Sequence, residues 1–456
     1  MVDTANQKTS SMHKKIRIQG GWVVDPASQL DALADVAIDD GKIVEVGSLR
    51  AGFQADVTVN ATGCIVIPGL VDLSARLREP GYEHAGMLAS ELKAALAGGV
   101  TSLVCPPDTD PVLDEPGLIE MLRYRAQAQN GTRVFPLGAL TRGLKGEVLT
   151  EMLALTEAGC VAFSQAEVPI ADTQVLLRAL QYASTYGLGV WLRPQDLHLG
   201  KGVAASGPLA TRMGLSGIPV AAETIALHTI FELVKSTQAR VHLCRISSAD
   251  GLALVRQAKQ AGLPVTCDVS INSLHLSDVD MGYFDSRMRL TPPLRQQRDR
   301  EALRAGLADG TIDALVSDHT PVEEDAKTLP FAESEPGATG LELLLSLALK
   351  WSTEEKVALS VAMDRITRGP AAILQDAATT GGLGQLQPGC PADICVFDPK
   401  ASWIANAGAF KSQGKHTPFS GYEMPGRVRY TLVRGRVAYQ ADLLPDIGLI
   451  APKIHL

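Results

Sequence analysis

The stretch Val71–Glu79, VDLSARLRE, directly follows the apolar run CIVIPGL at Cys64–Leu70. An apolar run of this length is typical of a buried β-strand, and a parallel strand presents catalytic side chains just after its carboxyl end. Enzymes that hold a divalent metal at such a strand end usually have two histidines there, one residue apart. This sequence has Ser74 and Arg76 in those positions, so it predicts the frame of an active site without the usual metal ligands.

This run is the first of eight apolar runs that together predict the fold. The runs are short, rich in β-branched residues and apolar on both faces, as strands covered on both sides should be. They span residues 65–73, 100–106, 133–140, 160–164, 188–193, 240–247, 264–270 and 312–318. Helix-like segments follow at 89–99, 118–129, 148–159, 173–184, 223–236, 251–262, 299–310 and 342–351. Eight strand–helix units predict an α/β fold, a (β/α)8 TIM barrel. The alternative, an open doubly wound sheet, needs a glycine-rich phosphate turn after its first strand, which this sequence lacks.

The two flanks of the barrel have a different pattern, with strand-like runs around turns. A chain of 456 residues exceeds the size at which one core stops growing, so a second, smaller domain is expected. We predict a composite β-sandwich domain from residues 15–67 and 383–440, with the barrel at 68–382, a disordered tail at 1–14 and a C-terminal extension at 441–456. The acidic, aperiodic segment 320–340 is expected to be a mobile loop over the barrel mouth.

Composition and charge narrow the class of protein and its partners. The net charge is −8 and there is no basic run, which argues against nucleic acid or an anionic membrane as a partner. The seven cysteines form no C-x-x-C pair, which favours reduced thiols and a cytoplasmic location. No apolar stretch approaches the ~20 residues needed to cross a bilayer, and the first 14 residues lack the apolar segment of a signal peptide.

The residues at the carboxyl ends of the predicted strands form a polar set that is unsuited to binding a metal cation. In strand order they are Ser74, Arg76 and Arg78; Asp108; Gln165; Arg193, Gln195 and Asp196; Arg245; Asn272; and Asp318 and His319. Zinc sites use imidazoles, thiolates or carboxylates, whereas a guanidinium is always protonated and has no lone pair to donate. Three arginines at one mouth would repel a dication.

Several motifs resemble those of dihydroorotase, within the cyclic amidohydrolase group. They are VDLSARLREPG (71–81), GCVAFSQ (159–165), HLCRISS (242–248), TPPLR (291–295), SDHTP (317–321) and ADICVFDP (392–399). The resemblance covers nearly the whole chain after the tail. It implies a barrel of the metal-dependent-hydrolase type and a zinc-dependent ring opening of dihydroorotate to carbamoyl aspartate, a step of pyrimidine biosynthesis.

The same resemblance implies which positions would hold the metal, and most of them carry other residues here. Members of this type have D-x-H-x-H, and this chain has Asp72 followed by Ser74 and Arg76. The bridging ligand falls at Gln165 or Ala166, and the two later histidines fall at Arg193 and Arg245. Only Asp318, which the family also uses as its catalytic base, is kept. We therefore expect no zinc or other cofactor.

The substrate positions implied by the resemblance are also altered. Arg78 matches the arginine that binds the substrate carboxylate. Its two asparagine partners fall at Asp108 and Thr291, and a histidine near the lid falls at Val322. A carboxylate at Asp108 would repel an anionic substrate.

These substitutions leave two interpretations of the barrel mouth and three of the function. Arg76, Arg193 and Arg245 either pair with Asp318 and Asp196 in a neutral cluster or form a pocket for an anion. Inactive bacterial homologues of this kind associate with aspartate transcarbamoylase. By resemblance we therefore expect a non-catalytic structural or assembly subunit for the aspartate transcarbamoylase catalytic chain that also forms a homodimer. The alternatives are an active or residual cyclic amide hydrolase and an anion-binding regulatory subunit. His242 and Cys244 are interpreted as core residues.

Overall fold

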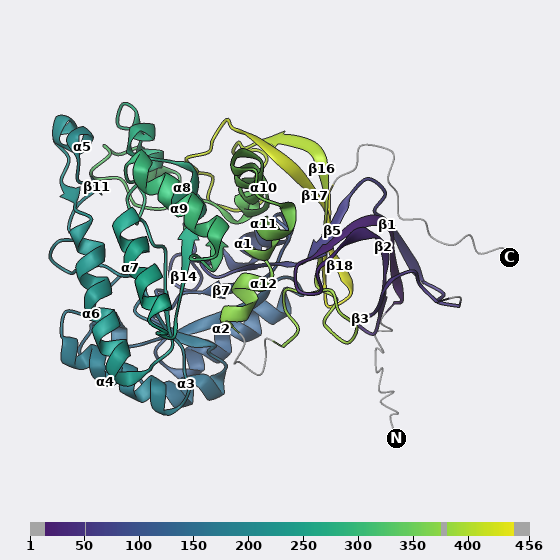
Figure 1. Ribbon diagram of the computed structural model, residues 1–456, viewed down its shortest axis with the longest axis horizontal. Helices are drawn as coiled ribbons and strands as arrows, with labels where there is room; N and C mark the ends of the chain where they lie inside the picture. Colours follow the sequence, from purple (N-terminus) through teal and green to yellow (C-terminus); the bar gives the residue numbers. More distant parts are fainter. Residues whose placement is uncertain (1–13, 51, 375–380, 442–456) are drawn as a thin grey trace, which may run out of the picture.

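A parallel sheet of eight strands forms the larger part of the molecule (Figure 1). The computed structural model describes residues 14–50, 52–374 and 381–441, so the predicted tail and C-terminal extension, apart from Lys14 and Ala441, lie outside the described residues. The strands are β6 (Leu70–Asp72), β7 (Val100–Cys105), β8 (Arg133–Ala139), β9 (Ala162–Ser164), β10 (Val190–Leu192), β13 (Val241–Leu243), β14 (Val265–Ser270) and β15 (Ala314–Val316). They pair in this order from β6 to β15, and each falls within one of the predicted runs.

The segments that follow the first and last strands close the sheet into a barrel. The backbone N–H of Arg76 donates to the carbonyl of His319 at 2.8 Å, and the N–H of His319 donates to the carbonyl of Ser74 at 3.1 Å. The side chains of Val71, Phe135, Trp191 and other residues form a buried apolar cluster with members from β6 to β15. The predicted TIM-type barrel is confirmed.

Helices cover the outer face of the barrel and bury their apolar sides against it. The eight that follow the predicted segments are α1 (Leu88–Ala97), α2 (Pro116–Ala128), α3 (Met152–Ala158), α4 (Thr173–Thr185), α6 (Ala221–Thr237), α7 (Ala249–Gln260), α9 (Gln297–Asp309) and α10 (Leu344–Glu355). Local sequence fixes several ends: Asp172 and Ser248 accept from backbone N–H groups as N-caps of α4 and α7, and Gly159 ends α3 in the left-handed conformation.

Short elements occupy the connections. They are α5 (Pro208–Met213), α8 (Ile271–His275), α11 (Leu359–Asp364), α12 (Arg368–Ile373), the two-strand ladder β11 (Ala204–Ala205) and β12 (Gly217–Ile218), and the 3-10 turns η1 (Arg142–Leu144), η2 (Asp278–Met281), η3 (Ser286–Met288), η4 (Asp325–Lys327) and η5 (Leu341–Leu343). The segment 320–340 contains η4 and folds back on itself. The N–H of Thr320 donates to the carbonyl of Ala338 at 2.8 Å, and Lys327 Nζ donates to the carbonyl of Glu335 at 2.6 Å.

Strands from both ends of the chain form a second, mixed sheet. They are β1 (Ile16–Asp25), β2 (Leu30–Asp39), β3 (Lys42–Gly47), β4 (Val57–Asn60), β5 (Ile65–Pro68), β16 (Ile394–Ile404), β17 (Glu423–Val433) and β18 (Arg436–Gln440). β5 pairs in parallel with β1 and antiparallel with β16, which joins the N-terminal strands to the C-terminal ones. The sheet has its own buried core, which includes Ile18, Val36 and Ile394. The expected composite β domain is therefore present, with its strands linked in one hydrogen-bonded sheet.

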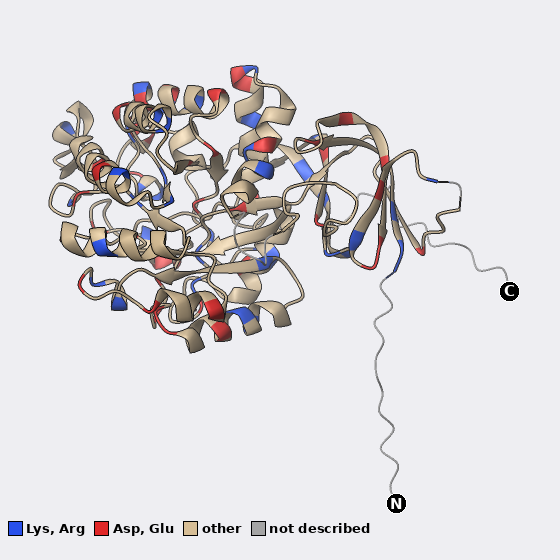
Figure 2. Cartoon of the chain, turned by 60° about the horizontal axis from the view of Figure 1, so that its bottom comes forward, with Lys and Arg blue, Asp and Glu red and all other residues tan. Residues whose placement is uncertain are grey.

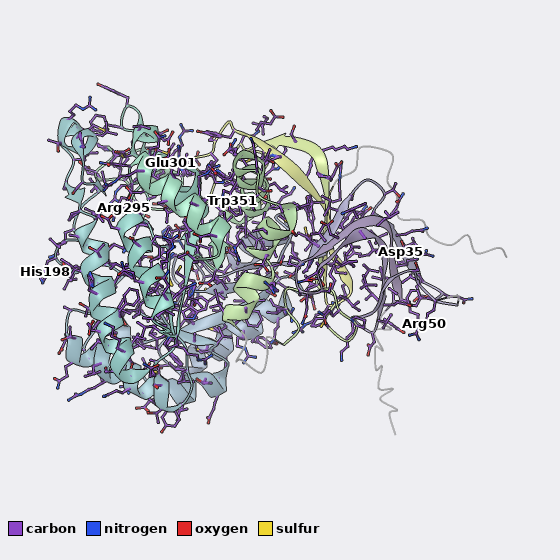
Figure 3. The ribbon with its side chains drawn as sticks, in the orientation of Figure 1. Asp35, Arg50, His198, Arg295, Glu301 and Trp351 are labelled. Atoms are coloured by element: carbon purple, nitrogen blue, oxygen red, sulfur yellow. The ribbon has the colours of Figure 1, made fainter. Side chains whose placement is uncertain are left out.

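The two parts of the molecule lie side by side, with α10 where they meet (Figure 1). Trp351 of α10 is fully buried there, whereas Asp35 and Arg50 lie in the β domain and His198 lies at the far end of the barrel (Figure 3). Acidic and basic residues are interleaved along the helices around the barrel (Figure 2). No described helix has both the length and the apolar character that crossing a membrane requires.

Candidate functional site

Three arginines converge on one carboxylate at the barrel mouth. Arg76 follows β6, Arg193 follows β10 and Arg245 follows β13, and all three reach Glu167, which follows β9. Arg76 Nη2 lies 2.8 Å from Glu167 Oε1, and Arg193 Nε lies 3.0 Å from Oε2. Arg245 Nη2 forms a third ion pair with Oε1. We call these four residues, together with Asp108 and Asp318, the arginine–carboxylate cluster.

Two further carboxylates complete the cluster. Arg76 Nε donates to Asp108 Oδ2 at 2.8 Å, and Arg245 Nη1 donates to Asp318 Oδ1 at 2.9 Å. Three guanidiniums therefore face three carboxylates, and their formal charges cancel. Two neutral acceptors contribute as well: Arg76 Nη1 donates to Thr320 Oγ1 at 3.2 Å, and Arg245 Nη1 also donates to the carbonyl of Thr291 at 3.2 Å.

The cluster is buried, and its electrostatics follow from that burial. The arginine side chains are only 5–7% exposed, against 31% for Glu167. Burial acts to raise the pKa of Glu167, but Arg245, Arg193 and Arg76 outweigh it and hold that pKa well below its usual range. Burial raises the pKa of Asp318 despite the opposing effect of Arg245 and Arg76. Glu167 is thus the firmly ionised centre of the cluster.

Two cavities reach arginines of the cluster. The cavity that reaches Arg193 and Arg245 measures only about 10 Å³, close to the space of a single water. A larger cavity of about 180 Å³ touches Arg193 but extends outward between α4 and α6. The three guanidinium groups themselves meet around Glu167 at the mouth.

Left-handed backbone turns bring the cluster residues together. Ala166, Arg245 and Asp318 have φ values of 49°, 56° and 51°, which residues other than glycine rarely adopt. The N–H of Arg245 donates to Asp268 Oδ1 at 2.7 Å, and the N–H of Ala166 donates to Ser164 Oγ at 3.0 Å. These buried contacts stabilise the strained turns, and the turn at Ala166 directs Glu167 into the mouth.

The structure places Gln165, the predicted bridging position, away from the cluster. Its Oε1 accepts from Thr141 Oγ1 at 3.0 Å and its Nε2 donates to the carbonyl of Leu144 at 2.8 Å. The carboxylate that the arginines share is Glu167, two residues further on, which the sequence analysis missed. The available signal was an acidic residue two positions after the end of the GCVAFSQ motif.

The other predicted site residues contribute in different ways. Ser74 is buried and accepts the barrel-closing bond from His319 through its carbonyl. Thr291 contributes its carbonyl to Arg245. Asp196, which the sequence places among the arginine partners, instead accepts from the N–H groups of His198 and Leu199 at 2.9 and 2.8 Å. Arg193 contacts Gln195 Oε1 as well as Glu167.

Arg78 lies at the edge of the mouth and outside the ion-pair cluster. Its Nε donates to the carbonyl of Pro321 at 2.8 Å, and its guanidinium carbon lies 5.8 Å from the centre of the Tyr82 ring. No described carboxylate lies within ion-pair distance of it. Burial and the neighbouring Arg76 lower its pKa, so Arg78 is a partly buried cation that lacks a protein counter-charge at contact.

A buried histidine behind the mouth holds the last strand end in place. His319 Nε2 lies 2.8 Å from Glu91 Oε2, and its Nδ1 accepts from Gly340 N–H at 3.1 Å. The proton is therefore on Nε2. Glu91 also accepts from Ser412 Oγ at 2.6 Å. Burial opposes ionisation of Glu91, yet His319 and these donors together lower its pKa.

One group of potential metal donors lies inside the described part of the barrel, below the cluster. His242, Cys244 and Asp268 offer one donor atom each within 4.8 Å of one another. The imidazole is already bonded on both sides, to Thr266 Oγ1 at 2.8 Å and to Asp268 Oδ2 at 2.9 Å. Burial and Asp268 raise the pKa of the Cys244 thiol well above its usual value. The three residues thus form a possible metal group in which the imidazole and the carboxylate already make hydrogen bonds within the protein.

Comparisons with known proteins agree on the family. The chain matches the family model described as "Dihydro-orotase-like" over residues 63–251 and the "Amidohydrolase family" model over residues 213–439. It is 46% identical to a "Dihydroorotase-like protein" of Pseudomonas aeruginosa, over 93% of this chain and 99% of the relative. It is 39% identical to a "Dihydroorotase" of Citrifermentans bemidjiense, with the same coverage.

Solved structures agree with the fold. The L-hydantoinase of Arthrobacter aurescens superimposes with a TM-score of 0.83 at 22% sequence identity, covering 94% of this chain and 97% of that one. At this level of identity the likeness concerns the fold alone.

Proposed function

Because this chain belongs to the dihydroorotase-like amidohydrolases, we propose that it is a homologue that has exchanged ring-opening activity for a structural role. In this proposal it is an assembly subunit for the aspartate transcarbamoylase catalytic chain and itself forms a homodimer. The observation that carries the loss of activity is the arginine–carboxylate cluster, in which three guanidiniums meet around Glu167 at the barrel mouth. The partner is proposed from the family resemblance.

The cluster supports the absence of a catalytic metal through simple charge chemistry. A divalent cation needs lone-pair donors, and the side chains of Arg76, Arg193 and Arg245 have none. Their ion pairs with Glu167 and Asp318 also use the carboxylate oxygens that a metal would need. A metal held by Glu167 and Asp318 would have to displace four buried ion pairs while lying beside three positive charges.

Without a metal, the remaining base has little to act on. A bound dication lowers the pKa of a water ligand from 15.7 towards 7, and a general base alone contributes about 10²–10⁴ in rate. Asp318 is further restrained because its Oδ1 accepts from Arg245 at 2.9 Å. We therefore propose that dihydroorotate is not opened at a physiologically useful rate.

A turnover assay tests the loss of activity. Purified protein supplied with zinc is expected to open dihydroorotate no faster than buffer, while an active dihydroorotase in parallel reports that the assay works. The Asp318→Asn variant is the matched control, because a rate that belongs to this barrel must fall when its base is removed. A rate that scales with protein concentration and is lost in Asp318→Asn would overturn the proposal.

The structural role is tested separately. A tagged copy expressed in the native host is expected to co-purify with the aspartate transcarbamoylase catalytic chain in a fixed ratio. Recovery of a homodimer alone, from a lysate that contains aspartate transcarbamoylase activity, would contradict the proposed partner while leaving the loss of activity untouched.

Arg78 favours a second candidate, a regulatory subunit that binds an anion. Its guanidinium has no described carboxylate at contact, and guanidiniums bind carboxylates through paired hydrogen bonds. Calorimetry with dihydroorotate and carbamoyl aspartate tests this candidate. Saturable binding that is lost in Arg78→Ala would support this candidate. If neither compound gives a heat of binding, the regulatory candidate is wrong and the structural role remains.

A further inference from the structure

A cavity lies far from the barrel mouth, at the opposite ends of the strands. It measures about 390 Å³ and opens between α2, the first residues of β8 and the hairpin formed by β17 and β18. It therefore spans the junction between the barrel and the β domain. Its volume falls in the range of small-molecule sites.

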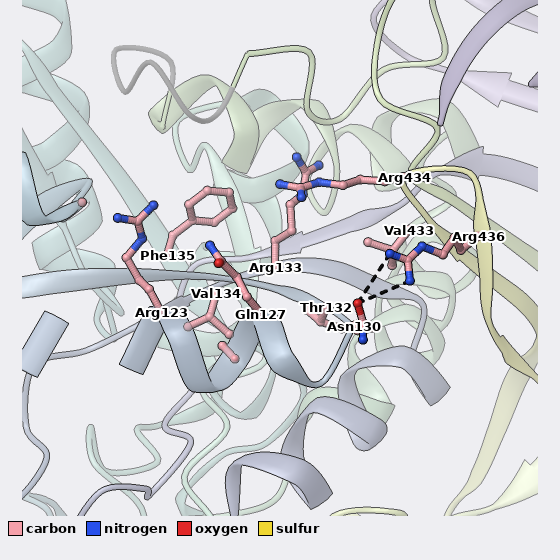
Figure 4. A pocket seen from close by; sticks show the side chains of 13 residues that line it. Arg123, Gln127, Asn130, Thr132, Arg133, Val134, Phe135, Val433, Arg434 and Arg436 are labelled. Carbon is pink, nitrogen blue, oxygen red and sulfur yellow. Dashed lines mark hydrogen bonds between the residues drawn. The ribbon is translucent and has the colours of Figure 1, made fainter. Parts of the chain in front are cut away.

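Four arginines line this cavity, which we call the junction pocket. They are Arg123 of α2, Arg133 at the start of β8, and Arg434 and Arg436 of the hairpin (Figure 4). Only Arg133 has a carboxylate partner among the described residues, Asp393. Arg123 Nη1 donates to the carbonyl of Ala158 at 2.7 Å, and Arg436 donates to Asn130 Oδ1 at 3.3 Å. Four positive charges thus face one negative charge.

Local structure positions two of the four arginines, Arg123 and Arg434. Arg434 and Gly435 form the two-residue turn of the hairpin, with φ values of 47° and 70°, and the N–H of Arg434 donates to Asp393 Oδ1 at 2.8 Å. On the barrel side, Gly159 leaves room for Arg123, since a Cβ there would lie 2.1 Å from Arg123 Nη1. The Arg434 backbone and the Arg123 side chain are therefore held by specific contacts, whereas the side chains of Arg434 and Arg436 are exposed.

Arg133 shows that positive charge at this site is not fully compensated. Its side chain is 11% exposed, and its Nε is buried without a hydrogen-bond partner. Burial and the nearby Arg434 lower its pKa to about 10, although Asp393 lies beside it. Figure 4 shows the guanidiniums of Arg133 and Arg434 directed towards one another. Like charges brought together in this way favour an anion between them.

We propose that the junction pocket binds a small polyphosphate anion, such as pyrophosphate or the di- or triphosphate of a nucleotide. Guanidiniums are suited to phosphate oxygens because their planar N–H groups form paired, charge-assisted hydrogen bonds. Several phosphate groups match several arginines better than a single phosphate does. Since the arginines come from both parts of the molecule, the bound anion also links the barrel to the β domain.

Binding of pyrophosphate to the full-length protein, measured by calorimetry at constant ionic strength near 0.15 M, tests this site. The variant Arg434→Ala/Arg436→Ala removes two exposed arginines of the hairpin that line the pocket; the side chain of Arg436 donates to the neutral Asn130. Arg178→Ala, at an exposed position on α4, is the matched control. The double variant is expected to bind at least about tenfold more weakly and the control to bind like the wild type. ADP and ATP are measured in parallel to show whether the ligand is a nucleotide or a polyphosphate alone. If either nucleotide binds more tightly than pyrophosphate, its nucleoside contributes to binding.

Thermal unfolding supplies a second readout, since an anion that links two parts of the native state raises the melting temperature. Pyrophosphate is expected to raise it for the wild type and for Arg178→Ala, and less for the double variant. The proposal is overturned if pyrophosphate does not bind saturably, if orthophosphate and sulfate bind equally well at the same ionic strength, or if the double variant binds like the wild type.

Discussion

Replacing Glu167 with glutamine removes the carboxylate that three arginines share. Its ion pairs include 2.8 Å to Arg76 and 3.0 Å to Arg193, with a third to Arg245. Removing one partner of a buried ion pair costs about 3–5 kcal/mol. Because the Glu167 side chain is 31% exposed, water screens part of this interaction, and we expect a loss of about 2–4 kcal/mol in the free energy of unfolding.

Two matched substitutions give the expected order. Asp108 has one arginine partner and is 24% exposed, so Asp108→Asn is expected to cost about 1–2 kcal/mol. Glu232 is 70% exposed in a surface pair with Lys235, and Glu232→Gln is expected to cost less than about 1 kcal/mol. Urea unfolding at pH 7 measures all three. A Glu167→Gln variant as stable as Glu232→Gln would refute the central place given to this carboxylate.

The pH dependence of the same variant supplies a further check. Because the native pKa of Glu167 is depressed, its contribution is present above the unfolded value of about 4.3 and is lost as the pH falls through the native pKa. The difference between wild type and Glu167→Gln should therefore shrink in acid. Formate should partly restore the stability of Glu167→Ala, since it can bind between the unpaired guanidiniums, and should leave the wild type unchanged.

Three further predictions concern buried groups elsewhere in the barrel. Burial raises the pKa of Asp72 to about 7. The stabilisation that comes from protonated Asp72 is therefore lost as the pH rises from about 4 through about 7, by at most ~1.4 kcal/mol per pH unit. Urea titrations should show this slope for the wild type and not for Asp72→Asn. Glu91→Gln removes the charged partner of the buried His319, 2.8 Å away. It is expected to lower the free energy of unfolding in urea by about 2–4 kcal/mol. An unchanged free energy of unfolding would contradict the role of this pair. Burial raises the pKa of the Cys105 thiol to about 12, so iodoacetamide at pH 8 should alkylate Cys105 only after denaturation, as mass spectrometry would show.

The strands of the barrel were predictable because burial on both faces leaves a continuous apolar run. The run at 65–73 was predicted as one strand, but it divides into β5 of the mixed sheet and β6 of the barrel. The division falls at Gly69, where a Cβ would lie 2.2 Å from Thr101 Oγ1. That close approach is a tertiary contact, and no local pattern announces it.

The convergence of Arg76, Arg193 and Arg245 was predictable from strand order, because the carboxyl ends of parallel strands meet at one mouth. The position of Glu167 was not, because it depends on the left-handed turn at Ala166. The grouping of His242 and Asp268 depends on the lateral pairing of β13 with β14.

Anomalous diffraction at the zinc edge, from crystals soaked in a zinc salt, tests most directly whether guanidiniums have replaced the metal at the mouth. We predict ordered side-chain density for Arg76, Arg193 and Arg245 around Glu167 and no anomalous peak among them. A zinc peak within bonding distance of Asp318 or Glu167, with the arginines displaced, would contradict that claim.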